Sequence, residues 1–255
     1  MRRALLLVDR GSREPEVRQE LDEICAIAKN LGGYDYANYC FLEVLPPYIP
    51  EGIGGCIENR ADYITLMPYF LYPGMKLKDT VKKSAQIGRE RKLKIAITKP
   101  LCYHPMMTQL IIDRVAEAKQ KNGIDQSDND CDVLIIGHGS SDRNAHDAFI
   151  HAVESTKARY RKVHHCFLEL DKPGIEEGIS QAISNNPKIL LIMPYFLHRG
   201  AHVKKDIANE VSAALAKHNF TNAFMCRHLG VDDKLVQLVI ERAAEVEKRA
   251  GIQSQ

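Results

Sequence analysis

Tryptophan is absent from this chain of 255 residues, and so is any long apolar run. No uninterrupted apolar stretch approaches the roughly 18 residues that a membrane-spanning helix needs, which argues against a membrane partner. The apolar part of the N-terminal MRRALLLVDRGS is five residues long. A signal-peptide core has about 7–15 such residues, so we expect a cytoplasmic protein.

The chain also has little net charge and no paired cysteine motif. A formal charge of +2 is too close to neutral to favour nucleic acid as a partner. The seven cysteines are an odd number without a CxxC pair, which argues against a disulfide framework or a zinc knuckle. The glycine-rich spacing of nucleotide-binding loops is missing as well, which disfavours a flavodoxin-like nucleotide binder.

What the chain does contain is an internal repeat. Gly139 follows Gly11 by 128 residues, and Glu169 follows Glu43 by 126 residues. Pro194 also follows Pro68 by 126 residues. Chance does not keep the offset this nearly constant across three blocks, so we interpret the chain as a tandem duplication. The recurring blocks are ALLLVDRGSREP (4–15) as VLIIGHGSSDRN (133–144), CFLEVLPPYIPEGI (40–53) as CFLELDKPGIEEGI (166–179), and LMPYFLYPGMKLKDTV (66–81) as IMPYFLHRGAHVKKDI (192–207).

Each half alternates short apolar strands with amphipathic helices, such as those predicted over residues 15–30 and 144–161. This alternation predicts βαβ units, a parallel sheet and right-handed crossovers. The polar, turn-rich stretch 122–130 is the expected linker. We therefore predict an α/β protein of two similar flavodoxin-like domains, residues 1–122 and 131–255. Each would be a parallel β-sheet flanked by helices, with an inter-domain cleft.

Two histidines and a glutamate follow strand ends in the second half. His138 follows the first strand, Glu169 the second, and His202 lies just beyond the third. Neighbouring parallel strands are about 4.8 Å apart, and open α/β sheets bind ligands at these ends, so the three groups can converge. Two imidazoles and a carboxylate suit divalent Fe, Co, Ni or Zn. The alternative for each histidine is a hydrogen-bonded residue at a strand end.

The first half lacks both histidines. Arg10 stands in place of His138 and Lys76 in place of His202, whereas Glu43 matches the glutamate of the second half. Arginine keeps its proton and is not a metal ligand. We therefore predict a degenerate first site, in which Arg10 and Lys76 neutralise Glu43 or present positive charge to an anionic substrate.

The order of strand, Gly-His-Gly-Ser, helix, Phe-Leu-Glu and a histidine after the third strand resembles the sirohydrochlorin chelatases of the CbiX/SirB type, which are class II chelatases. The resemblance covers nearly the whole chain and implies two chelatase-like domains, the N-terminal one degenerate and the C-terminal one active. Many two-repeat members carry the functional motif in the first half, whereas this chain has it in the second.

The activity that the resemblance implies is ATP-independent insertion of Co²⁺ or Fe²⁺, with Ni²⁺ possible, into sirohydrochlorin. Two protons are released, in siroheme or cobalamin biosynthesis, and no cofactor beyond the substrate metal is needed. His138, Glu169 and His202 match the family's metal-binding and proton-accepting residues. The protein would be a monomer or a homodimer.

The implied substrate carries eight carboxylates, which need cationic groups, hydroxyls or backbone donors around them. The alternative for each such residue is a solvated position on a helix or loop. The candidates for these contacts are Ser140, Ser141, Arg143, His198 and Arg199 in the second half, with Arg10 and Lys76 in the first.

Two other functions stay open. A protoporphyrin-type ferrochelatase would need a membrane-facing apolar lip, for which the sequence offers no stretch and no tryptophan. A non-catalytic carrier of metal or tetrapyrrole would bind both components without turnover.

Overall fold

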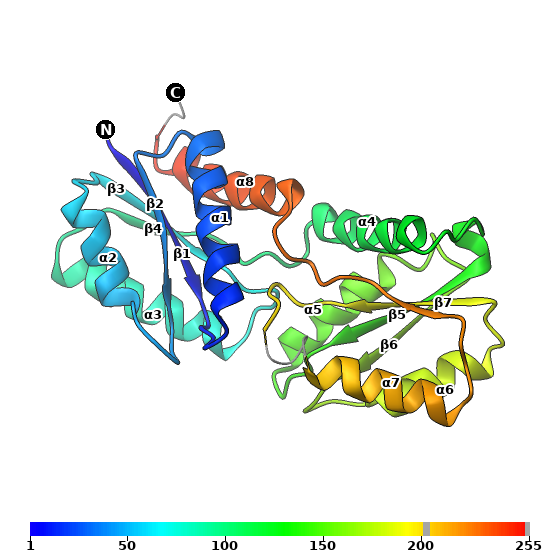
Figure 1. Ribbon diagram of the computed structural model, residues 1–255. Helices are drawn as coiled ribbons and strands as arrows, with labels where there is room; N and C mark the ends of the chain where they lie inside the picture. Colours follow the sequence, from blue (N-terminus) through cyan, green and yellow to red (C-terminus); the bar gives the residue numbers. More distant parts are fainter. Residues whose placement is uncertain (201–204, 253–255) are drawn as a thin grey trace. The chain divides into compact units, whose positions relative to one another are not determined.

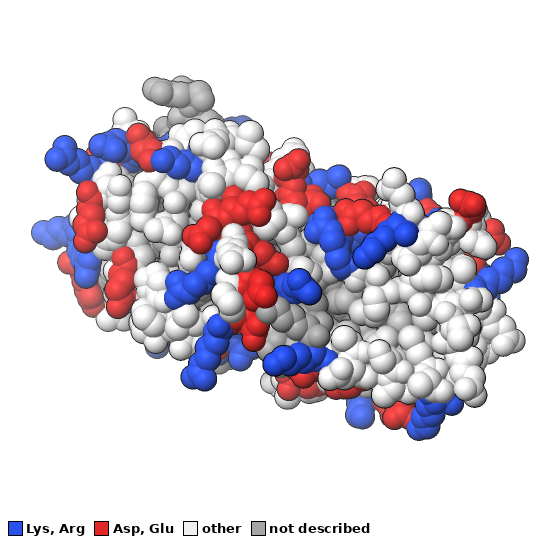
Figure 2. All heavy atoms as spheres, viewed as in Figure 1, with Lys and Arg blue, Asp and Glu red and all other residues white. Residues whose placement is uncertain are grey.

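The computed structural model describes residues 1–200 and 205–252 (Figure 1). The chain divides into two compact units. Unit 1 combines residues 1–102 with the described residues from Val231 onward, and unit 2 comprises Tyr103–Gly230. Among the described residues, no helix is long and apolar enough to cross a membrane. Figure 2 shows cationic and acidic side chains interspersed over the face in view, as the small net charge leads us to expect.

Unit 1 is built on a parallel sheet with the strand order β2-β1-β3-β4. Every residue of β1 and β3 is buried, because helices cover both faces of the sheet. Helices α2 and α3 pack on one face around an aliphatic core, and α1 and α8 lie together on the other (Figure 1). The elements are β1 (Arg3–Asp9), α1 (Pro15–Gly32), β2 (Tyr36–Phe41), α2 (Ile49–Glu58), β3 (Tyr63–Pro68), α3 (Met75–Glu90), β4 (Ile95–Ile97) and α8 (Asp233–Arg249).

Unit 2 repeats this plan with the strand order β6-β5-β7-β8. Helices α6 and α7 pack on one aliphatic core, while α5 packs against β6 and α4 against β7. The predicted class, two α/β repeats with parallel sheets flanked by helices, is confirmed. The elements are α4 (Pro105–Lys121), a 3-10 turn (Asp128–Asp130), β5 (Cys131–Gly137), α5 (Arg143–Glu154), β6 (Lys162–Phe167), α6 (Ile175–Ser184), β7 (Ile189–Pro194), α7 (Ile207–Lys217) and β8 (Ala223–Met225).

One predicted helix is shorter than its pattern. The sequence predicts a helix over 144–161, but α5 ends at Glu154. Ser155 and Thr156 follow it, and their hydroxyls donate to the carbonyls of His151 and Val153, each at 2.7 Å. Such local side-chain bonds compete with the next helical turn, so the chain leaves the helix here.

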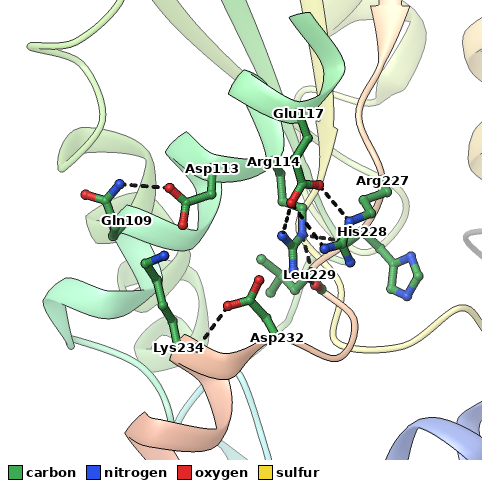
Figure 3. A network of polar contacts seen from close by, with 9 residues as sticks. All are labelled: Gln109, Asp113, Arg114, Glu117, Arg227, His228, Leu229, Asp232 and Lys234. Carbon is green, nitrogen blue, oxygen red and sulfur yellow. Dashed lines mark hydrogen bonds and ion pairs between the residues drawn. The ribbon is translucent and has the colours of Figure 1, made fainter. Parts of the chain in front are cut away.

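The last helix of each half packs in the unit of the other half. Helix α4 belongs to unit 2 and α8 to unit 1. Arg114 of α4 is fully buried and donates from Nε to the Leu229 carbonyl at 3.0 Å (Figure 3). Arg242 of α8 makes the equivalent bond in unit 1, from Nη2 to the Cys102 carbonyl at 3.1 Å. A buried guanidinium needs acceptors, so each arginine ties its helix to the segment that follows the last strand of its unit, after β8 for Arg114 and after β4 for Arg242.

The compact units therefore differ from the repeat boundaries, 1–122 and 131–255, by the exchange of α4 and α8. A buried carboxylate contributes to the exchange. Glu247 of α8 is 2% exposed and accepts bonds from the Arg3 guanidinium at 2.7 Å and the Thr65 hydroxyl at 2.6 Å, both in unit 1. A buried carboxylate is stable only where cationic and hydrogen-bonding partners surround it. Helical periodicity shows that α8 has an apolar face, but not which sheet that face covers.

Candidate functional site

The ends of β5 and β6 bring His138 and Glu169 together in unit 2. The ladder between the two strands continues past their ends, since the Glu169 amide donates to the His138 carbonyl at 3.0 Å. The two side chains leave the sheet at the same edge, and His138 Nε2 lies 3.1 Å from Glu169 Oε1. The His138 side chain is 27% exposed and that of Glu169 is 47% exposed. His138 Nε2 itself is buried, although both side chains are partly exposed. An imidazole and a carboxylate in contact can share a cation or a proton.

Gly139 sets how closely the two chain segments approach. Its φ is +90°, a backbone conformation that suits glycine. A Cβ at this position would lie 1.7 Å from the Glu169 carbonyl oxygen, far inside any real contact. Gly11 occupies the equivalent turn in unit 1, with φ +105° and a virtual Cβ 2.4 Å from the Glu43 oxygen. The Gly-Ser turn after the first strand of each half therefore lets the backbone pass directly over the glutamate.

Ser140 and Arg143, which lie near this turn, each have a partner close in sequence. Ser140 Oγ accepts from the Asp142 amide at 3.0 Å, and Asp142 in turn caps α5 by accepting from the Asn144 amide at 2.9 Å. The Arg143 side chain is 93% exposed and lies 3.8 Å from Asp147 on its own helix. Ser141 is exposed as well. These residues line the start of α5, and their role as substrate contacts stays a prediction.

The third predicted ligand, His202, lies outside the described residues. His198 is half-buried and Arg199 is exposed, each with a partner in the structure. The described part of the chain contains no group of three or more His, Cys, Asp or Glu side chains that could hold a metal ion. The structure thus brings together two of the three predicted ligands, and the convergence of all three stays a prediction.

In unit 1 two ion pairs lie at the equivalent position. Glu43 Oε1 accepts from Arg10 Nε at 3.0 Å, and Oε2 accepts from Lys76 Nζ at 2.5 Å. Partial burial raises the pKa of Glu43, but the hydrogen bonds and charges of Lys76 and Arg10 outweigh it and hold this pKa below its ordinary value. Both cations therefore pair with Glu43 and both carboxylate oxygens are occupied, while the interpretation of this place as a degenerate metal site stays a prediction.

Sequence reasoning missed a second histidine–carboxylate pair beside the site. His146 Nδ1, on α5, lies 2.6 Å from Asp171 Oδ2, two residues after Glu169. The signal was present in the repeat: the first half has Arg18 and Leu45 at these two positions. Because both positions differ between the halves, and only the second half has a histidine and an aspartate there, the pair is specific to the second half.

Comparison with known proteins agrees with the repeat and the fold. A sequence model of the CbiX family matches residues 4–118 and 132–246. A sirohydrochlorin cobaltochelatase of Priestia megaterium is 24% identical over 247 residues, which cover 95% of this chain and 79% of that protein. A sirohydrochlorin ferrochelatase of the same organism is 26% identical over 249 residues, 92% of this chain and 87% of that one.

Among solved structures, SirB from Bacillus subtilis with Fe³⁺ has a TM-score of 0.81 and 21% identity, with each chain fully covered. SirB from Bacillus subtilis subspecies spizizenii in complex with cobalt has a TM-score of 0.79 and 20% identity, again with full coverage of both chains. These likenesses confirm the fold, and the two family matches fall on the two repeats. The chain therefore belongs to the CbiX family and carries the family's pattern twice.

Proposed function

We propose that this protein is a sirohydrochlorin chelatase, an ATP-independent enzyme that inserts a divalent metal into the tetrapyrrole and releases two protons. The contact between His138 and Glu169 at the strand ends of unit 2, 3.1 Å apart, carries the proposal. Membership of the CbiX family supports it, together with relatives of that activity that align over more than nine-tenths of the chain.

Insertion exchanges two pyrrole N–H protons for one dication, so the site needs a group that holds the ion and a base for each proton. A neutral imidazole can do either, because its ordinary pKa lies near 6.5. We assign this role to His138 and, outside the described residues, to His202. Glu169 supplies the negative charge that balances the ion and favours proton acceptance by the neighbouring imidazole.

The site in unit 1 would serve the substrate's carboxylates. Arg10 and Lys76 bring two positive charges against the single negative charge of Glu43, so the cluster keeps a net positive charge. Guanidinium and ammonium donors with spare hydrogens suit carboxylates. Ser140, Ser141, Arg143, His198 and Arg199 are the corresponding candidates in unit 2.

The substrate metal and the pathway stay proposals as well. Relatives named for cobalt and for iron both align with this chain. A histidine and carboxylate set accepts Co²⁺, Fe²⁺ and Ni²⁺ alike, since affinity alone does not set selectivity. We propose Co²⁺ or Fe²⁺, in cobalamin or siroheme biosynthesis, in a cytoplasmic monomer or homodimer.

The test is a multiple-turnover assay with sirohydrochlorin and Co²⁺, Fe²⁺ or Ni²⁺ in turn, followed by the absorption spectrum of the macrocycle. His138→Ala and Glu169→Gln should abolish or severely reduce turnover, whereas His151→Ala, an exposed histidine on α5, should not. A carrier would bind both components and stop at one equivalent of product. Turnover that survives in the His138 variant would overturn the assignment.

A further inference from the structure

Two chain segments leave the site, and a pair of side chains joins them just beyond it. The first segment runs from His138 through the Gly-Ser turn into α5, and the second is the loop 169–174. His146, one turn into α5, and Asp171, in the loop, lie 2.6 Å apart between Nδ1 and Oδ2. We propose that His146 and Asp171 form a brace that positions Glu169 to hold the substrate metal, an inference that rests on the proposed function.

The loop needs such a brace because its own conformation is unfavourable. Leu170 has φ +64°, in the left-handed region, and its side chain is 69% exposed. A left-handed L-residue costs about 1–2 kcal/mol, and an exposed side chain offers no packing to compensate. Asp171 holds the loop from both carboxylate oxygens, since Oδ1 accepts from the Lys172 amide at 3.0 Å while Oδ2 contacts His146.

Asp171 also contacts the backbone of the site directly. Its amide donates to the Glu169 carbonyl at 2.8 Å, the same carbonyl that passes closest to Gly139. A Cβ on Gly139 would lie 3.3 Å from the Asp171 Cβ. Asp171 is therefore bonded to the backbone of Glu169 and lies next to the turn that follows His138.

His146 is itself held in place by the core. Its ring stacks on Phe167 at the end of β6, with centroids 5.5 Å apart and an interplanar angle of 28°. Phe167 is 1% exposed and packs on Phe149 of α5, with centroids 5.0 Å apart. Through His146, the buried aromatic residues at the end of β6 therefore hold an exposed loop in place.

The first half shows what the brace replaces. Arg18, at the position of His146, lies over Phe41 at 5.1 Å and donates to the Pro46 carbonyl at 2.6 Å. Leu45 stands where the second half has Asp171 and cannot accept a hydrogen bond from its side chain. The bond from Arg18 to the Pro46 carbonyl takes the place of the side-chain pair. Each half therefore has a hydrogen-bonded contact between this helix and this loop. The side-chain pair occurs in the half that carries His138.

The experiment compares His146→Ala, Asp171→Ala and the double variant with the wild type. Loss of groups that orient metal ligands lowers metal affinity or activity by about 10–100-fold. We expect each single variant to raise KM for Co²⁺ about tenfold, with KM for sirohydrochlorin unchanged. The losses should not add in the double variant, because either change removes the same contact. Equilibrium Co²⁺ binding, measured calorimetrically without tetrapyrrole, should weaken by the same factor.

His146→Arg is the rescue variant, because arginine can stack on Phe167 and donate to Asp171, and it should restore most of the Co²⁺ affinity. His164→Ala is the matched control. His164 Nε2 pairs with Asp132 Oδ2 at 3.1 Å near the start of β5, at the opposite end of the strand from His138. This control should change the melting temperature and leave both KM values alone.

The brace is refuted if His146→Ala shifts the melting temperature but neither Co²⁺ affinity nor KM for Co²⁺. Equal losses in His146→Arg and His146→Ala would also refute it. Failure of the proposed function gives a different result, because the wild type would then show no turnover, whereas the brace is judged from the ratio of variant to wild type in Co²⁺ binding.

Discussion

Replacing Gly139 by alanine probes the closest backbone approach in the site. The new methyl group would lie 1.7 Å from the Glu169 carbonyl oxygen, whereas real Cβ contacts are essentially never under 3.0 Å, so one of the two segments must move by about 1.3 Å. Alanine at φ +90° adds a conformational penalty of about 1–2 kcal/mol to the folded state. A misplacement of about 1 Å in a reacting centre lowers the rate by about 10²-fold.

We therefore expect Gly139→Ala to lower kcat/KM for Co²⁺ insertion about a hundredfold. Its free energy of unfolding in urea should fall by at least 1–2 kcal/mol. Gly123→Ala is the control, since Gly123 also has a left-handed φ, +64°, but nothing within 4 Å of its virtual Cβ. It should show the conformational penalty and normal activity. Activity within about threefold of wild type in Gly139→Ala would contradict the reasoning, because the predicted displacement would then have no effect on the chemistry.

Three further predictions concern unit 1. Glu247→Ala should lower the free energy of unfolding by about 3–5 kcal/mol in urea titrations, because it leaves the Arg3 guanidinium buried without its carboxylate. A loss of less than about 1 kcal/mol would contradict this prediction. The lowered pKa of Glu43 means that its ion pairs stabilise the fold above the ordinary carboxyl pKa and that this stability is lost as pH falls through the folded value. Lys76→Met should therefore raise the Glu43 pKa in a carboxyl ¹³C NMR titration. Arg10→His combined with Lys76→His should create a second Co²⁺ site, seen as a change from one to two bound ions in calorimetry, and an unchanged stoichiometry would count against a degenerate metal site.

The sequence predicted those parts of the fold that depend on local pattern and on the repeat. Continuous apolar runs predicted the buried strands. The strand ends predicted that His138 and Glu169 lie together, because neighbouring parallel strands end at the same edge of the sheet. The replacement of one histidine by Arg10 predicted the ion pairs of unit 1, since a fixed positive charge beside Glu43 has one natural partner.

The parts that sequence could not supply depend on tertiary packing. The apolar pattern of α8 does not indicate which sheet the helix covers, and the structure places it in unit 1 with Glu247 and Arg242 buried. The brace of His146 and Asp171 was hidden for a similar reason, because 25 residues separate the two positions and a contact between a helix and a loop follows no periodicity.

The central claim is that His138 and Glu169 form one site that inserts metal into a tetrapyrrole. The most direct test is the initial rate of Co²⁺ insertion into sirohydrochlorin, with substrate in large excess over enzyme, for the wild type and His138→Ala. We expect many turnovers by the wild type and none above the uncatalysed rate in the variant. Equal rates for the two proteins, or a wild type that halts after one equivalent, would contradict the claim.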